Sequence, residues 1–132
     1  MIKFLIFFLI FGTIKSELLY PESGSTLYQT HVRFEWIEHP QANQYMLYVS
    51  NGNDIINDCV ICGEIIDSKS LIFIAKSNLN WNTLYNWQIK YLDNMGNEIG
   101  ASSINTFSIG PSISNVTTTN FETNSEKELT MF

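Results

Sequence analysis

The chain has 132 residues, of which 45% are hydrophobic and 14% aromatic, and this is enough for one buried core without a metal. Thirteen acidic side chains outnumber seven basic ones, so the formal net charge is −6. Phosphate backbones bind clusters of Lys and Arg, and this composition therefore argues against a nucleic-acid partner.

The chain begins with a pattern typical of a secretory signal peptide. Lys3 precedes an unbroken apolar run over residues 4–11, and the segment ends with the small residues Gly12, Thr13 and Ser16. We predict cleavage after Ser16, which assigns residues 1–16 to the signal peptide and makes the protein secreted or exposed at the cell surface. A retained membrane anchor is the weaker alternative, because a spanning helix needs about 20 apolar residues. Membrane contact is expected only if this segment is not cleaved.

Alternation of apolar and polar residues then predicts three short strands. The first lies around residues 18–20, before a turn marked by Pro21 and Gly24. The second and third follow on either side of a break at Pro40. Their core-facing residues are Val32, Phe34, Trp36, Tyr45, Leu47 and Val49.

Residues 50–58 are turn formers, and the Asn-Gly pair at positions 51 and 52 is the strongest turn signal in the chain. The loop carries oxygen ligands of the kind that calcium takes, but its Gly stands second and not sixth, as an EF-hand would require. A solvated loop is the better interpretation, and no metal is predicted. The oxygen-bearing residues are Asn51, Asn53, Asp54, Asn57 and Asp58.

The second half of the chain continues the strand pattern. Apolar segments at residues 59–66 and 71–75 predict two more strands, and residues 85–91 alternate cleanly, with Tyr85, Trp87, Ile89 and Tyr91 on one face. A hairpin turn with Gly96 in a positive-φ conformation leads to a last strand over residues 99–109, with Phe107 and Ile109 facing inward. Because no stretch has a helical period, we predict an all-β sandwich of seven or eight strands.

The segment from Leu79 through Thr83 to Tyr85 resembles the tyrosine corner of the fibronectin type III family, although Trp81 stands where that family usually has Pro. The patterns of residues 32–36 and 45–49 are similar to its strands B and C.

This resemblance implies an immunoglobulin-like β-sandwich, which we assign to residues 17–110. It implies that the Tyr85 hydroxyl bonds to backbone a few residues upstream, and that Trp36 fills the space between the sheets. The polar residues 111–132 are predicted to be a flexible tail or linker.

Cys59 and Cys62 form a C-x-x-C pair with several possible roles. A local disulfide, or two buried thiols, is the leading interpretation for an oxidising compartment. A redox motif would need a helix N-terminus, and zinc would need two further ligands, for which only His31 and His39 are available. We expect both histidines to be exposed surface groups, and no catalytic motif accompanies them.

The candidate binding residues are Met46, Tyr48 and Gln88, expected with Lys90 on the outer face of the sheet, and Trp81 at the corner. Asn115 begins an N-x-T sequon that would accept a glycan in a eukaryotic secretory pathway.

Together these features predict a secreted, non-catalytic module that binds a protein or glycan partner and needs no cofactor. The alternative is an N-terminal accessory domain of a larger secreted enzyme, such as a sulfotransferase or a polysaccharide-degrading enzyme.

Overall fold

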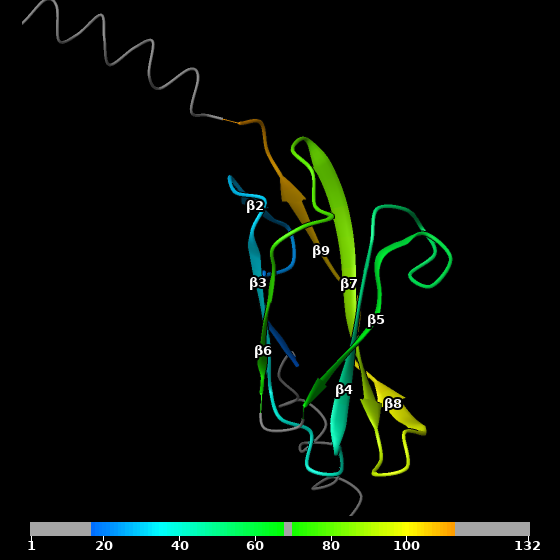
Figure 1. The fold of residues 1–132 in the computed structure, drawn as a ribbon. Helices are drawn as coiled ribbons and strands as arrows, with labels where there is room; N and C mark the ends of the chain where they lie inside the picture. Colours follow the sequence, from blue (N-terminus) through cyan, green and yellow to red (C-terminus); the bar gives the residue numbers. More distant parts are fainter. Residues whose placement is uncertain (1–16, 68–69, 113–132) are drawn as a thin grey trace, which may run out of the picture.

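The computed structural model describes residues 17–67 and 70–112, and within them it contains nine strands and no helix (Figure 1). The predicted signal peptide, residues 1–16, and the glycosylation candidate Asn115 lie outside the described residues. The strands are β1 (Leu18–Tyr20), β2 (Ser25–Leu27), β3 (Val32–Trp36), β4 (Gln44–Ser50), β5 (Cys59–Asp67), β6 (Ile72–Ala75), β7 (Thr83–Leu92), β8 (Glu98–Ala101) and β9 (Asn105–Ile109).

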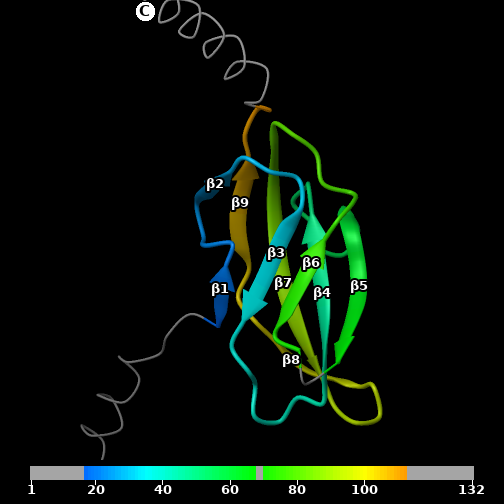
Figure 2. The ribbon, with the colours of Figure 1, turned by 60° about the vertical axis from the view of Figure 1, so that its left-hand side comes forward.

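The strands form two sheets that face each other, as Figure 2 shows. The smaller sheet has the order β1-β3-β6, and both of its pairs are antiparallel. The larger sheet has six strands in the order β2-β9-β7-β4-β5, and β8 pairs with the end of β7. The all-β, sandwich-like class predicted from the alternation is therefore confirmed.

The core lies between the two sheets and is rich in aromatic rings. Trp36 of β3 meets Tyr45 of β4 edge to face, with ring centroids 5.6 Å apart, and Phe34 meets Trp87 in the same way at 5.1 Å. Such edge contacts are favourable because the positive edge of one ring meets the negative face of the other. The alternating residues predicted to face inward are all buried: Val32, Phe34, Trp36, Tyr45, Leu47, Val49, Tyr85, Trp87, Ile89, Tyr91, Phe107 and Ile109.

The corner before β7 has the predicted geometry. The Tyr85 hydroxyl accepts a hydrogen bond from the backbone N–H of Asn80 at 2.7 Å, and Leu79 is buried beneath the turn. Asn82 takes a positive φ of 56°, which Asn tolerates better than most residues, and this reverses the chain into β7. The ring of Tyr85 stacks on Phe107, so the corner is fixed to the core.

The described residues form nine strands, whereas the sequence predicted seven or eight, and two features account for the difference. The three residues of β2 pair in parallel with β9, more than 80 positions later, and no local pattern marks so short a strand. The last strand, expected to run without interruption over residues 99–109, is divided into β8 and β9 by Ser102, for a reason given below.

Replacing Tyr85 by Phe should lower the free energy of unfolding by about 1–3 kcal/mol, because the Asn80 N–H loses its partner. Chemical denaturation followed by tryptophan fluorescence measures this change. Tyr28→Phe is the matched control, since the Tyr28 ring is exposed, and it should change stability by less than about 0.5 kcal/mol. If Tyr85→Phe and Tyr28→Phe lowered the free energy of unfolding equally, the hydrogen bond at the corner would not contribute the stability assigned to it.

Candidate binding surfaces

Three of the four predicted binding residues lie together on the outer face of the larger sheet. Met46 and Tyr48 of β4 point outward because Leu47 between them is buried, and in the β4–β7 ladder they stand opposite Lys90 and Gln88. All four outward side chains are half-buried. We call Met46, Tyr48, Gln88 and Lys90 the outer-sheet face.

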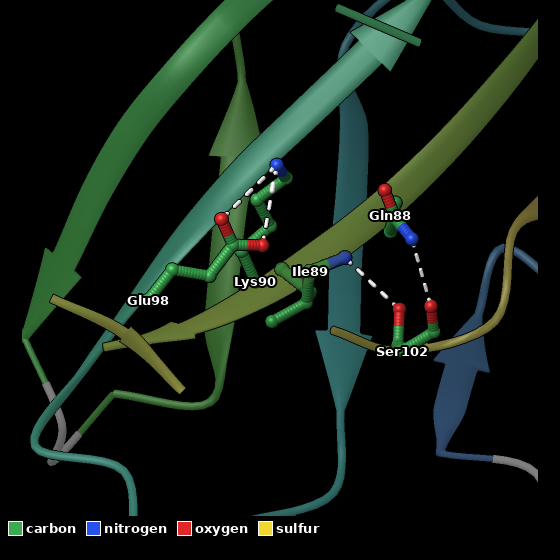
Figure 3. Close-up of polar contacts among 5 residues, drawn as sticks. All are labelled: Gln88, Ile89, Lys90, Glu98 and Ser102. Atoms are coloured by element: carbon green, nitrogen blue, oxygen red, sulfur yellow. Dashed lines mark hydrogen bonds and ion pairs between the residues drawn. The ribbon is translucent and has the colours of Figure 1, made fainter. Parts of the chain in front are cut away.

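Polar contacts with neighbouring segments hold this face in place (Figure 3). The Lys90 ammonium lies 3.2 Å from a carboxylate oxygen of Glu98 and 5.3 Å from the ring centroid of Tyr48. The Gln88 amide donates to the Ser102 carbonyl at 2.9 Å. The surface is therefore largely preorganised before any partner arrives.

Ser102 connects this face to the core and explains the break between β8 and β9. Its backbone N–H donates to the Ile89 carbonyl at 2.8 Å, while its hydroxyl accepts from the Ile89 N–H at 3.0 Å and donates to the Ser103 carbonyl at 2.7 Å. A side-chain oxygen thus replaces the carbonyl that a continuous ladder would supply. The Ser102 carbonyl is turned toward Gln88 instead, which is why the predicted continuous strand was wrong at this point.

The oxygen-rich loop between β4 and β5 is ordered by its own backbone. One Asp54 carboxylate oxygen accepts from the N–H groups of Ile56 and Asn57, both at 2.9 Å, and the Asp58 carboxylate accepts from the Asp54 N–H. The bond from the Asn57 N–H, followed by that from Ile56, holds the pKa of Asp54 below its ordinary value. In residues 17–67 and 70–112 no group of three or more His, Cys, Asp or Glu residues could hold a metal ion.

Cys59 and Cys62 form a disulfide within β5, so the leading interpretation of the C-x-x-C pair is confirmed. Cys62 stands opposite Tyr48 in the ladder, and the register shifts on both sides of this point. Gly63, at a φ of 75°, follows the bridge. A Cβ there would lie 3.0 Å from the Tyr48 hydroxyl, so the absence of a side chain leaves room for the tyrosine. The bridge and Gly63 therefore lie at the edge of the outer-sheet face, beside Tyr48.

Trp81 is not part of the outer-sheet face. It precedes β7, whereas Gln88 lies five positions after Thr83, the first residue of that strand, and this is about 16 Å along it at the usual rise. Trp81 is 37% exposed at the end of the sandwich where β7 begins. The candidate binding residues therefore lie on two surfaces, with Trp81 at the corner and the other three on the sheet face.

The two histidines have different environments. His31 is exposed, as expected. His39 is half-buried and its ring stacks on Tyr91, with centroids 4.3 Å apart, so the expectation of an exposed group was wrong here. The Tyr91 hydroxyl donates to the Glu17 carboxylate at 2.7 Å, and burial first, then this bond, raises the pKa of Tyr91. Tyr91 lies 52 positions from His39 and 74 from Glu17, which is why the sequence did not reveal these contacts.

A cavity of about 150 Å³ lies between β5 and β6, at the open side of the sandwich. This is smaller than the pockets of about 300–1,000 Å³ that usually hold small molecules. Its lining residues are Ile61, Glu64, Phe73, Ala75, Lys76, Ser77 and Asn78.

Comparison with known proteins gives a likeness in fold and no family. No family model and no curated protein matches the chain. Among solved structures it is similar to an α-L-rhamnosidase from Dictyoglumus thermophilum, with 18% identity and a TM-score of 0.54. The match covers 75% of this chain and only 13% of the rhamnosidase chain. It shows that this fold also occurs as a small part of a large glycosidase.

The described part of the chain contains no helix with the length and apolar character needed to cross a membrane.

Replacing Ser102 by Ala should lower the free energy of unfolding by about 1–3 kcal/mol, because the buried Ile89 N–H loses its acceptor. Denaturation with guanidinium measures the loss, and amide hydrogen exchange at Ile89 should become faster. Ser103→Ala is the control, since that side chain is exposed. If hydrogen exchange at the Ile89 amide were unchanged in the Ser102 variant, the Ser102 hydroxyl would not be the acceptor that replaces the ladder carbonyl.

The Asp54 carboxyl should titrate below its ordinary pKa of 3.8. Because its pKa is lowered in the folded state, Asp54 contributes stability above the unfolded value, and this is lost as the pH falls through the folded value. Carboxyl NMR titration measures the midpoint directly. A midpoint at or above 3.8 would show that the backbone bonds of the loop do not act on this group. Asp54→Asn should make the unfolding free energy less dependent on pH in the acid range.

Proposed function

We propose that this chain is a secreted, non-catalytic interaction module of the fibronectin type III family. The order β1-β3-β6 in one sheet and β9-β7-β4 in the other is compatible with strands A-B-E and G-F-C of an immunoglobulin-like sandwich. The hydrogen bond of the Tyr85 hydroxyl at the corner also supports this assignment. Such folds serve mainly as frames for binding surfaces, so the function must be argued from the surface itself.

The outer-sheet face is the surface proposed to bind the partner. The observation that carries the proposal is that four side chains on the adjacent strands β4 and β7 point outward from the same face of the sheet. Tyr and Met are enriched in protein interfaces, and Tyr48 and Met46 stand here beside an ion pair that offers both signs of charge. Ile65, which is 49% exposed and lies opposite Met46 in β5, extends the apolar part of the face. This chemistry favours a protein over a glycan as the partner of this face.

A second proposal is that the chain acts as an accessory domain of a larger secreted enzyme. It is supported by the likeness to 13% of a rhamnosidase chain, which is compatible with a glycan-related domain. Under this proposal the outer-sheet face would contact the catalytic domain of the same enzyme.

The test is a binding measurement with site-specific variants. The chain would be used to capture proteins from the extracellular medium of the source organism. Each captured protein would be purified, and its Kd for the chain would be measured by biolayer interferometry. Tyr48→Ala and Lys90→Ala should each weaken binding by tenfold or more, as expected for a central interface residue that contributes about 2 kcal/mol. Ile74→Ser, on the exposed face of the smaller sheet, is the control. Equal Kd values for all three variants would contradict the proposed face.

A further inference from the structure

Three segments that are far apart in the sequence meet at the end of the sandwich where β9 ends. The Gly110 N–H donates to the Leu27 carbonyl at 2.8 Å, and the Gly110 carbonyl accepts from the Asn82 N–H at 3.1 Å. Figure 2 shows β9 ending and β7 beginning at this same end, with the connection from β2 to β3 beside them. Gly110 is therefore bonded on both sides and holds the three segments together.

The ring of Tyr28 lies directly against Gly110. A Cβ on Gly110 would stand 2.7 Å from one ring carbon of Tyr28 and 3.1 Å from another, so a larger residue at position 110 would require the ring to move. Tyr28 is nevertheless 53% exposed. The ring is supported on one side by backbone while much of it faces solvent, which is the arrangement needed for stacking against a ligand.

A second aromatic residue is displayed at the same end. Trp81 is 37% exposed and immediately precedes Asn82, whose N–H is bonded to Gly110. The turn that carries Trp81 is restrained, because Asn82 has a positive φ and the Thr83 hydroxyl donates to the Trp81 carbonyl at 3.0 Å. We call Tyr28, Trp81 and Gly110 the aromatic end.

The segments that build the aromatic end carry no charge. Residues 23–30, 77–89 and 99–112 contain no Asp, Glu, Lys or Arg, although the chain as a whole has a net charge of −6. The polar side chains that these segments carry are hydroxyls and amides, such as those of Thr26, Asn80 and Ser108. A charged ligand would find no opposite charge on these segments. A neutral ligand with many hydroxyls would hydrogen-bond to these polar groups and stack its C–H faces on the aromatic rings.

We propose that the aromatic end is a binding site for a neutral glycan, with Tyr28 and Trp81 as its stacking residues. This site is separate from the outer-sheet face and does not depend on the protein partner proposed for that face. Tyr28 was not among the residues selected from the sequence, because its position against Gly110 is a contact between residues 82 positions apart.

The test uses the full chain as exported and three neutral probes, cellohexaose, mannohexaose and xylohexaose, with a heparin hexasaccharide as the anionic comparison. Binding is followed by NMR, through the indole N–H signal of Trp81, and by calorimetry. At least one neutral hexasaccharide should bind and shift the Trp81 signal, while heparin should not bind. Tyr28→Ala and Trp81→Ala should each reduce the affinity about tenfold or more, the loss expected for about 1.4 kcal/mol.

Two further variants keep the outcome interpretable. Tyr28→Phe retains the ring and should keep the affinity within about threefold, which separates stacking from any loss of folding. Tyr48→Ala, on the outer-sheet face, should leave glycan binding unchanged, so a failure here and a failure of the proposed protein interface can be told apart. The proposal is overturned if no neutral hexasaccharide binds, if only heparin binds, or if binding survives both alanine substitutions at the aromatic end.

Discussion

The packing of aromatic rings between two unequal sheets is the constraint on which the rest of this structure depends. Trp36 and Phe34 of the small sheet meet Tyr45 and Trp87 of the large one, and all four are almost completely buried. This packing is retained even though, among the described residues, the indole N–H groups of both tryptophans are buried without a hydrogen-bond partner. Because side chains alternate along a strand, the inward residues also decide which side chains face outward.

Hydrogen bonds from side chains to backbone then modify the regular sheets at two places. The Tyr85 hydroxyl takes up the Asn80 N–H at the corner, and the Ser102 hydroxyl takes up the Ile89 N–H where the last strand is interrupted. The first bond holds the turn that presents Trp81. The second frees a carbonyl that orients Gln88. Both candidate surfaces are therefore positioned by bonds that reach into the core.

The two surfaces differ in chemistry, which is the reason for assigning them different ligands. The outer-sheet face combines Met46 and Tyr48 with the ion pair of Lys90 and Glu98, whereas the segments of the aromatic end are free of charge. A module with two such sites could bring a protein and a glycan together.

The sequence by itself determined most of the strands and the inward residues, because a period of two is a local signal. The hydrogen bond of Tyr85 was implied by the resemblance of the corner segment to that of a known family, and the structure contains it. The sequence also indicated the bridge between Cys59 and Cys62, which are only three positions apart. Tertiary structure alone decided the parallel pairing of β2 with β9, the stacking of His39 on Tyr91, and the contact of Tyr28 with Gly110. Periodicity tells which face of a strand a residue occupies, but not which distant segment lies beside it.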